Sequence, residues 1–89
     1  MVRAFTISFE FDGRVYLALA SIKTREKESL CSVRIFDDSL ERIVPERQLT
    51  YSNENPLCPT SLHHPSALRL FSSISNAVDH HLQAAVIHK

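Results

Sequence analysis

The 89-residue sequence balances ten lysines and arginines against ten aspartates and glutamates, so its formal net charge is zero. A balanced charge offers no general attraction to nucleic acid phosphates or to an anionic membrane surface. An apolar fraction of 44% and a single glycine argue against a disordered or low-complexity chain. We expect a single domain over residues 1–89 with its own hydrophobic core.

Several features of the sequence bear on its cellular compartment. Residues 1–6 lead directly into a strand-like alternation, so we expect no leader segment. The longest apolar run, Val15–Ala20, has six residues, whereas a membrane span needs about twenty. Two cysteines without close spacing do not form the framework of a disulfide-rich secreted domain. These features predict a cytoplasmic protein with no membrane partner.

The first two segments, residues 2–11 and 14–22, are predicted to form a hairpin. Large apolar side chains alternate with polar ones along the first segment, at Phe5, Ile7, Phe9 and Phe11. Asp12-Gly13 suits a two-residue turn in which both central residues have positive φ. The turn then predicts four facing pairs: Phe11 with Arg14, Phe9 with Tyr16, Ile7 with Ala18, and Phe5 with Ala20.

The opposite face of this hairpin is half apolar, with three polar residues beside three large apolar ones: Thr6, Ser8 and Glu10 beside Val15, Leu17 and Leu19. A solvated sheet face is mainly polar, so we expect something to cover this one. One interpretation is a homodimer, formed through the Val15, Leu17 and Leu19 face or through the helix edge. The alternative is that Tyr51, or Val86 and Ile87, folds across it.

Two further strands are predicted, over residues 30–37 and 40–51. The first places Cys31, Val33 and Ile35 on one side. Asp37-Asp38-Ser39 supplies turn residues, and the second strand fits the edge of the sheet because Pro45 lacks a ladder donor. Residues 52–64 contain two prolines and few apolar side chains, so we expect an irregular connection there.

A C-terminal helix is predicted over residues 65–83. Pro65 suits the first helical position, and His64 or Ser66 is the expected cap. Apolar residues recur at helical spacing, at Ala67, Leu70, Phe71, Ile74, Ala77, Val78, Leu82 and Ala85. The predicted fold is α+β, a three- or four-stranded antiparallel β-meander packed on one face by this helix. The core then joins the alternating residues of the first strand to Leu70, Phe71, Ile74 and Val78.

The histidines and cysteines are the first candidates for chemistry. His63-His64 and His80-His81 are adjacent pairs, and neighbours on a helix point about 100° apart, so a metal site needs one pair to meet the other across space. We expect instead that these histidines are solvated. Cys31 is expected to pack as a small apolar side chain, and Cys58, in the irregular connection, to be the more accessible thiol.

Other charged residues suggest weaker alternatives. Asp37, Asp38 and Glu41 form an acidic cluster, which the turn explains without a cation. Scattered arginines could converge into a basic patch: Arg3, Arg14, Arg34, Arg42 and Arg47. We therefore keep, as an alternative function, a small-ligand or nucleic-acid-binding domain that uses the sheet face and residues 52–64. Nucleic acid is not the favoured partner, because the net charge is zero.

The sequence also has a recognisable layout: Phe11-Asp12-Gly13-Arg14-Val15-Tyr16, a later run from Ile35 to Pro45, and a closing helix that contains Leu82. This layout resembles small uncharacterised bacterial domains of unknown function. The resemblance implies a four-strand-plus-helix topology and no particular activity. We predict a non-enzymatic protein-interaction or regulatory module, and no catalytic, cofactor-binding or metal-binding residues.

Overall fold

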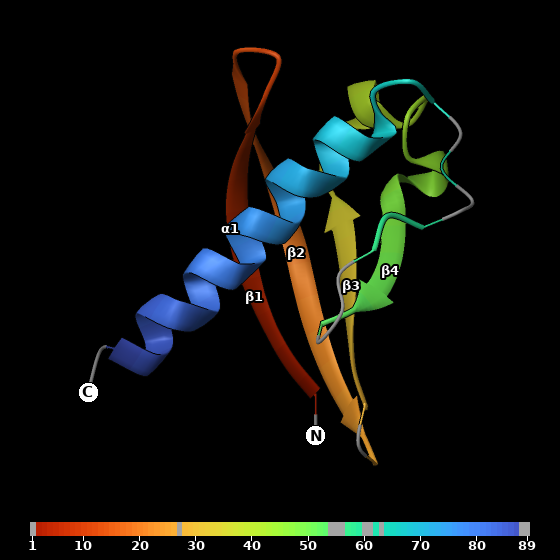
Figure 1. Cartoon of the computed structure of the whole chain (residues 1–89). Helices are drawn as coiled ribbons and strands as arrows, with labels where there is room; N and C mark the ends of the chain where they lie inside the picture. Colours follow the sequence, from red (N-terminus) through yellow and green to blue (C-terminus); the bar gives the residue numbers. More distant parts are fainter. Residues whose placement is uncertain (1, 27, 54–56, 60–61, 63, 88–89) are drawn as a thin grey trace.

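A computed structural model describes residues 2–26, 28–53, 57–59, 62 and 64–87. Four strands form one antiparallel sheet in the order β1-β2-β3-β4: Val2–Phe11, Arg14–Arg25, Glu28–Ile35 and Gln48–Ser52. A single α-helix of the described chain, α1 (Ala67–Ile87), lies diagonally across one face of the sheet (Figure 1). The predicted α+β meander with a C-terminal helix is confirmed.

The β1–β2 hairpin has the predicted register. Phe11 faces Arg14, and all the other predicted pairs of the hairpin also oppose each other. Asp12 and Gly13 form the turn with φ values of 51° and 78°, so both central residues are in the left-handed region. Positive φ at both positions matches the right-handed twist of the two strands, which makes this short turn compatible with a long hairpin.

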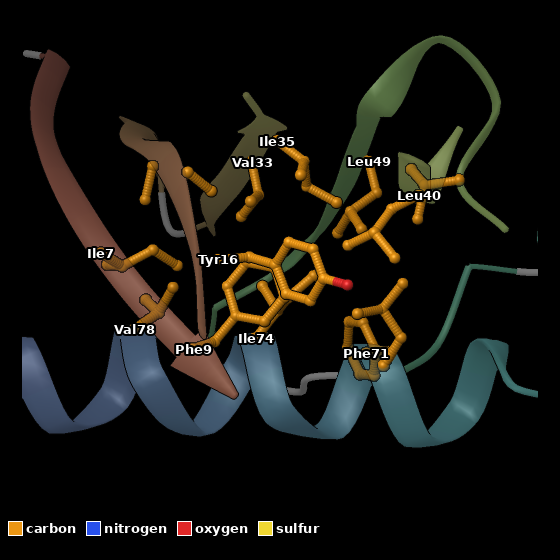
Figure 2. Close-up of a cluster of buried hydrophobic side chains, with 14 of the residues drawn as sticks. Ile7, Phe9, Tyr16, Val33, Ile35, Leu40, Leu49, Phe71, Ile74 and Val78 are labelled. Atoms are coloured by element: carbon orange, nitrogen blue, oxygen red, sulfur yellow. The ribbon is translucent and has the colours of Figure 1, made fainter. Parts of the chain in front are cut away.

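The core lies between the sheet and α1 (Figure 2). Ala18 and Ala20 have no exposed surface, and their small side chains leave room for the helix to approach β2. Tyr51 meets Phe71 edge to face, with 4.9 Å between ring centroids. Five helix residues are buried at spacings of three, four and seven: Ala67, Leu70, Phe71, Ile74 and Val78. The predicted core is confirmed, although Phe5 at its border is only half-buried.

The predicted strand over residues 40–51 is wrong in its first half. Two short 3₁₀ helices, Asp38–Leu40 and Pro45–Arg47, precede β4, which begins only at Gln48. The buried residues of this segment are Leu40, at the end of the first 3₁₀ helix, and Ile43 and Val44, which follow it. Their spacing of three and then one is that of a helical turn, and such a turn brings all three to the same side of the backbone.

Other boundaries also differ from the predictions. β2 continues to Arg25 and β3 begins at Glu28, beyond the predicted ends at residues 22 and 30, so Arg25 faces Glu28. β3 ends at Ile35 rather than at residue 37. The helix spans Ala67–Ile87 rather than residues 65–83, because a separate turn precedes it. No described helix is both long and apolar enough to cross a lipid bilayer.

Candidate functional site

The histidines do not converge in the part of the chain that is described. His64 precedes α1, where its Nδ1 accepts the Ser66 N–H at 3.0 Å and its carbonyl accepts the Ala67 N–H at 2.9 Å. His80 lies about four helical turns further along, so roughly 20 Å separates it from this cap. His63 is outside the described residues. Among those described, no three histidines, cysteines or acidic residues gather as metal ligands.

His81 is engaged in packing. Its imidazole stacks on the ring of Phe5, with 4.1 Å between centroids and 4° between planes. The guanidinium of Arg3 lies 6.0 Å from the Phe5 centroid, within cation–π range. This stack attaches the C-terminal half of α1 to the beginning of β1. The adjacent His80 is exposed.

Both cysteines are free thiols whose surroundings disfavour the thiolate. Cys31 has no exposed surface, and burial raises its pKa. Its cross-strand neighbour is Tyr51, a buried residue whose hydroxyl makes no conventional hydrogen bond among the described residues. Partial burial also raises the pKa of Cys58. A nucleophilic cysteine needs a lowered pKa, so these environments are the opposite of an activated thiol.

The acidic cluster is explained by the turn that contains it. The Asp37 carboxylate accepts the backbone N–H of Ser39 at 2.8 Å and caps the first 3₁₀ helix. That hydrogen bond lowers the pKa of Asp37, and the guanidinium of Arg14 at 3.8 Å lowers it further. Glu41 lies 3.8 Å from the guanidinium of Arg47. The carboxylates therefore serve local structure.

The arginines do not form one basic patch. Arg3 and Arg14 are at opposite ends of the hairpin, and the eight residue steps from Arg3 to Phe11, which faces Arg14, correspond to about 26 Å. Arg34 faces Leu19 on the side of the sheet away from α1. Arg47 pairs with Glu41 and also donates to the Phe36 carbonyl at 3.1 Å. Arg3, Arg14, Arg34 and Arg47 thus offer no continuous surface for a phosphate backbone.

The sheet side away from α1, here called the open face, carries an exposed apolar strip. Its members are Val15, 69% exposed, Leu17, 51%, Leu19, 37%, and Phe36, 52%. Val15, Leu17 and Leu19 alternate along β2. Phe36 lies beside Leu17, because its N–H donates to the Leu17 carbonyl at 3.1 Å. Tyr51 lies in the core on the other side, so it does not cover this strip.

A second surface feature is a groove between the outer edge of β1 and the flank of α1, here called the edge groove. Its volume is about 580 Å³. β1 contributes residues 6–10, and α1 contributes Ser73, Asn76, Ala77, His80 and His81. At one end the Ser73 hydroxyl donates to the Glu10 carbonyl. The groove therefore has a hydrogen-bonding strand edge as one wall and a helix as the other.

Sequence reasoning missed two parts of these surfaces. Phe36 could have been assigned to the open face, because it continues the alternation in which Cys31, Val33 and Ile35 point inward. The edge groove had no signal in the sequence, since it depends on where α1 crosses the sheet.

No protein-family model, curated protein or solved structure matches this chain. The surfaces that could carry a function are the apolar strip and the edge groove.

Proposed function

We propose that this protein is a non-enzymatic interaction module that associates with a second copy of itself through the apolar strip. The observation that carries the proposal is the exposure of Val15, Leu17, Leu19 and Phe36 as neighbours on a sheet face that no described element covers. Clustered apolar side chains on an otherwise polar surface mark interaction sites. Burying them between two copies would remove their surface from water on both sides at once.

The charges around the strip suit a second copy of the same chain. Glu10 is paired with Val15 on one side of β2, and Arg34 is paired with Leu19 on the other. Leu17, halfway between Val15 and Leu19, is therefore the midpoint between the two charges. Consider a two-fold axis that passes over Leu17, runs parallel to the plane of the sheet and is perpendicular to the Glu10–Arg34 direction. This axis places each carboxylate against the partner's guanidinium. The two sheets then cross steeply, as in orthogonal sheet packing.

A non-enzymatic role is supported by the structural roles of the side chains that could otherwise take part in catalysis. Cys31 is buried, Asp37 caps a turn, and His81 is stacked on Phe5. The compartment that we propose is the cytoplasm of a bacterial cell. Its support is the two free thiols and the resemblance of the sequence to small bacterial domains.

The test is the oligomeric state of the wild-type chain and of Leu17→Arg, measured by sedimentation equilibrium. We expect a wild-type dimer and a monomeric variant, because an arginine at the centre of the strip would bury an unpaired charge. Leu68→Arg is the matched control, since Leu68 is 68% exposed on α1 and lies outside the strip. A wild-type chain that stays monomeric at about 100 μM, a concentration that would populate any micromolar dimer, would overturn the proposal.

The charge pairing has its own test. Glu10→Arg and Arg34→Glu should each weaken the dimer, because each single change opposes like charges across the two-fold axis. The double variant should recover most of the lost affinity. A double variant weaker than both single variants would contradict the axis through Leu17.

A further inference from the structure

The edge groove borders the open face through Thr6, Ser8 and Glu10, and it leads to an inference beyond self-association. We propose that it binds an extended segment of another polypeptide, which pairs antiparallel with β1 as a fifth strand. Adding a strand to an exposed sheet edge is a general mode of peptide recognition, in which backbone hydrogen bonds supply affinity and flanking side chains supply selectivity. β1 is an edge strand of ten residues.

The backbone groups of β1 that face the groove follow from the hairpin. Phe11 and Arg14 flank the two-residue turn, so they exchange both hydrogen bonds, and the alternate residues of β1 bond to β2. The N–H and C=O groups of Ala4, Thr6 and Ser8 therefore point away from β2. The same parity directs the Glu10 carbonyl outward, where it accepts from Ser73. That carbonyl is occupied, so the free edge for an incoming strand is residues 4–8.

The helix wall determines which side chains the segment can carry. Ala77 is small and half-buried, and it lies between the polar Asn76 and His80 along the groove. In an added strand, alternate side chains would point to this wall, and the others would point toward the hydroxyls of Thr6 and Ser8. Small or β-branched apolar residues fit the first set, and threonine or serine fits the second.

A second copy of this chain is a poor occupant of the same groove. The C-terminal part of α1 runs past the β1 edge of the sheet (Figure 1). If the β1 strands of two copies paired, both α1 helices would lie on the same face of the joined sheet. The second copy's α1 would then enter the space beside β1 that the first α1 already occupies. A segment without a helix above it avoids this overlap. The proposed occupant is therefore a single extended segment of a different polypeptide.

The charges at the two ends of the groove select an orientation. Glu10 is at one end, whereas Arg3 lies beyond the other, beside the Phe5–His81 stack. An antiparallel segment begins opposite Glu10 and finishes opposite Arg3. Complementary charges at an interface fix orientation and register. The segment should therefore carry a basic residue at its start and an acidic residue at its end.

The probe for this proposal is a synthetic eight-residue peptide of sequence Lys-Ala-Thr-Val-Thr-Val-Thr-Glu, capped at both ends. Two control peptides accompany it. One exchanges only the lysine and the glutamate, and the other replaces both valines by proline, which prevents strand pairing. The measurement is a titration of ¹⁵N-labelled protein followed by NMR. We expect the first peptide to shift the backbone amides of Thr6 and Ser8, and the exchanged peptide to bind about three to ten times more weakly.

Two variants locate the binding. Ser8→Pro removes an outward-facing N–H, which β1 does not use toward β2, together with the Ser8 hydroxyl, and Ala77→Glu fills the groove with a longer side chain. Each should weaken peptide binding at least tenfold. Ser72→Glu is the matched control, because Ser72 is exposed on α1 and does not line the groove. Binding that survives both groove variants, or that shifts amides only around Leu17, would overturn the inference.

The two proposals fail independently. A monomeric Leu17→Arg variant should still bind the peptide, and an Ala77→Glu variant should still dimerise. Equal affinity for the charge-exchanged peptide would overturn the antiparallel orientation, and with it the inference. The absence of any shift at peptide concentrations of about 2 mM would also overturn it, since even weak peptide recognition is visible there.

Discussion

The imidazole of His81 lies flat on the phenyl ring of Phe5, with 4.1 Å between the ring centroids. The contact joins the last element of the fold to the first, and aromatic pairs of this kind contribute about 1 kcal/mol beyond their buried area. His81→Ala should therefore lower the free energy of unfolding by about 1 kcal/mol in urea denaturation. His80→Ala, at the exposed adjacent position, makes the same change in helix propensity without the stack. Equal effects of the two substitutions would contradict a stabilising stack.

A second prediction concerns the core under the helix. Ile74 is fully buried, so Ile74→Ala removes apolar contacts and leaves a cavity. The expected loss is about 2 to 5 kcal/mol in the free energy of unfolding, a large part of the stability of a domain of this size. Leu68→Ala, at an exposed position of the same helix, should change it by less than about 0.5 kcal/mol. Similar losses at the two positions would show that α1 is not docked by this face.

The hairpin turn gives a third prediction. Gly13 has a φ of 78°, and a Cβ added there would meet no atom within 4 Å. Gly13→Ala therefore costs only the left-handed backbone conformation, about 1 kcal/mol by urea denaturation. Gly13→Asn should cost less, because asparagine tolerates this region. A loss of several kcal/mol in Gly13→Ala would mean that something more than backbone conformation is disturbed.

The two thiols should differ in reactivity toward a disulfide reagent. Cys31 has no exposed surface, whereas Cys58 is only partly buried. In native protein we expect Cys58 to react slowly, because burial raises its pKa and reduces the thiolate fraction. Cys31 should react only after unfolding in urea. The Cys58→Ala variant isolates Cys31, and rapid labelling of that variant without denaturant would contradict the buried position.

The fifth prediction concerns pH. The pKa of Asp37 is lowered from its ordinary value of 3.8 by the Ser39 N–H, with a smaller effect from Arg14. A carboxyl whose folded pKa lies below its unfolded pKa stabilises the fold fully above the unfolded value and progressively less as pH falls through the folded value. The stability advantage of wild type over Asp37→Asn should thus be present near neutral pH and decline below about pH 4. An advantage that grows on acidification would have the wrong sign.

The register of the hairpin was predictable to the residue because two independent local signals agree on it. The alternation from Phe5 to Phe11 assigns the faces, and Asp12-Gly13 defines the turn. The prediction of a strand over residues 40–44 was wrong because the local signals in this segment conflict. Apolar residues at 40, 43 and 44 satisfy a helical turn, while the resumption of apolar residues after a turn suggested a strand. Short segments of this kind are decided by packing, which local pattern does not contain.

The two surfaces proposed for binding also differ in how far the sequence predicts them. Val15, Leu17 and Leu19 could be assigned to one face from alternation alone, so the apolar strip was largely predictable. The edge groove was not, because it depends on the crossing direction of α1 over β1. That direction follows from the small side chains of Ala18 and Ala20 together with the aromatic rings around them. The crossing direction is therefore set by how these side chains pack in three dimensions, and the periodicity of the sequence does not contain that information.

The packing of α1 on β1 also has a consequence for how the chain is synthesised. The two elements are separated by most of the sequence, so the apolar side of the hairpin cannot be covered until residues 67–78 have left the ribosome. Until then Ile7, Phe9 and Phe11 remain open to solvent or to a chaperone. The first half of the nascent chain should therefore be prone to aggregation until α1 is synthesised. A chain whose synthesis stalls before residue 67 should be insoluble.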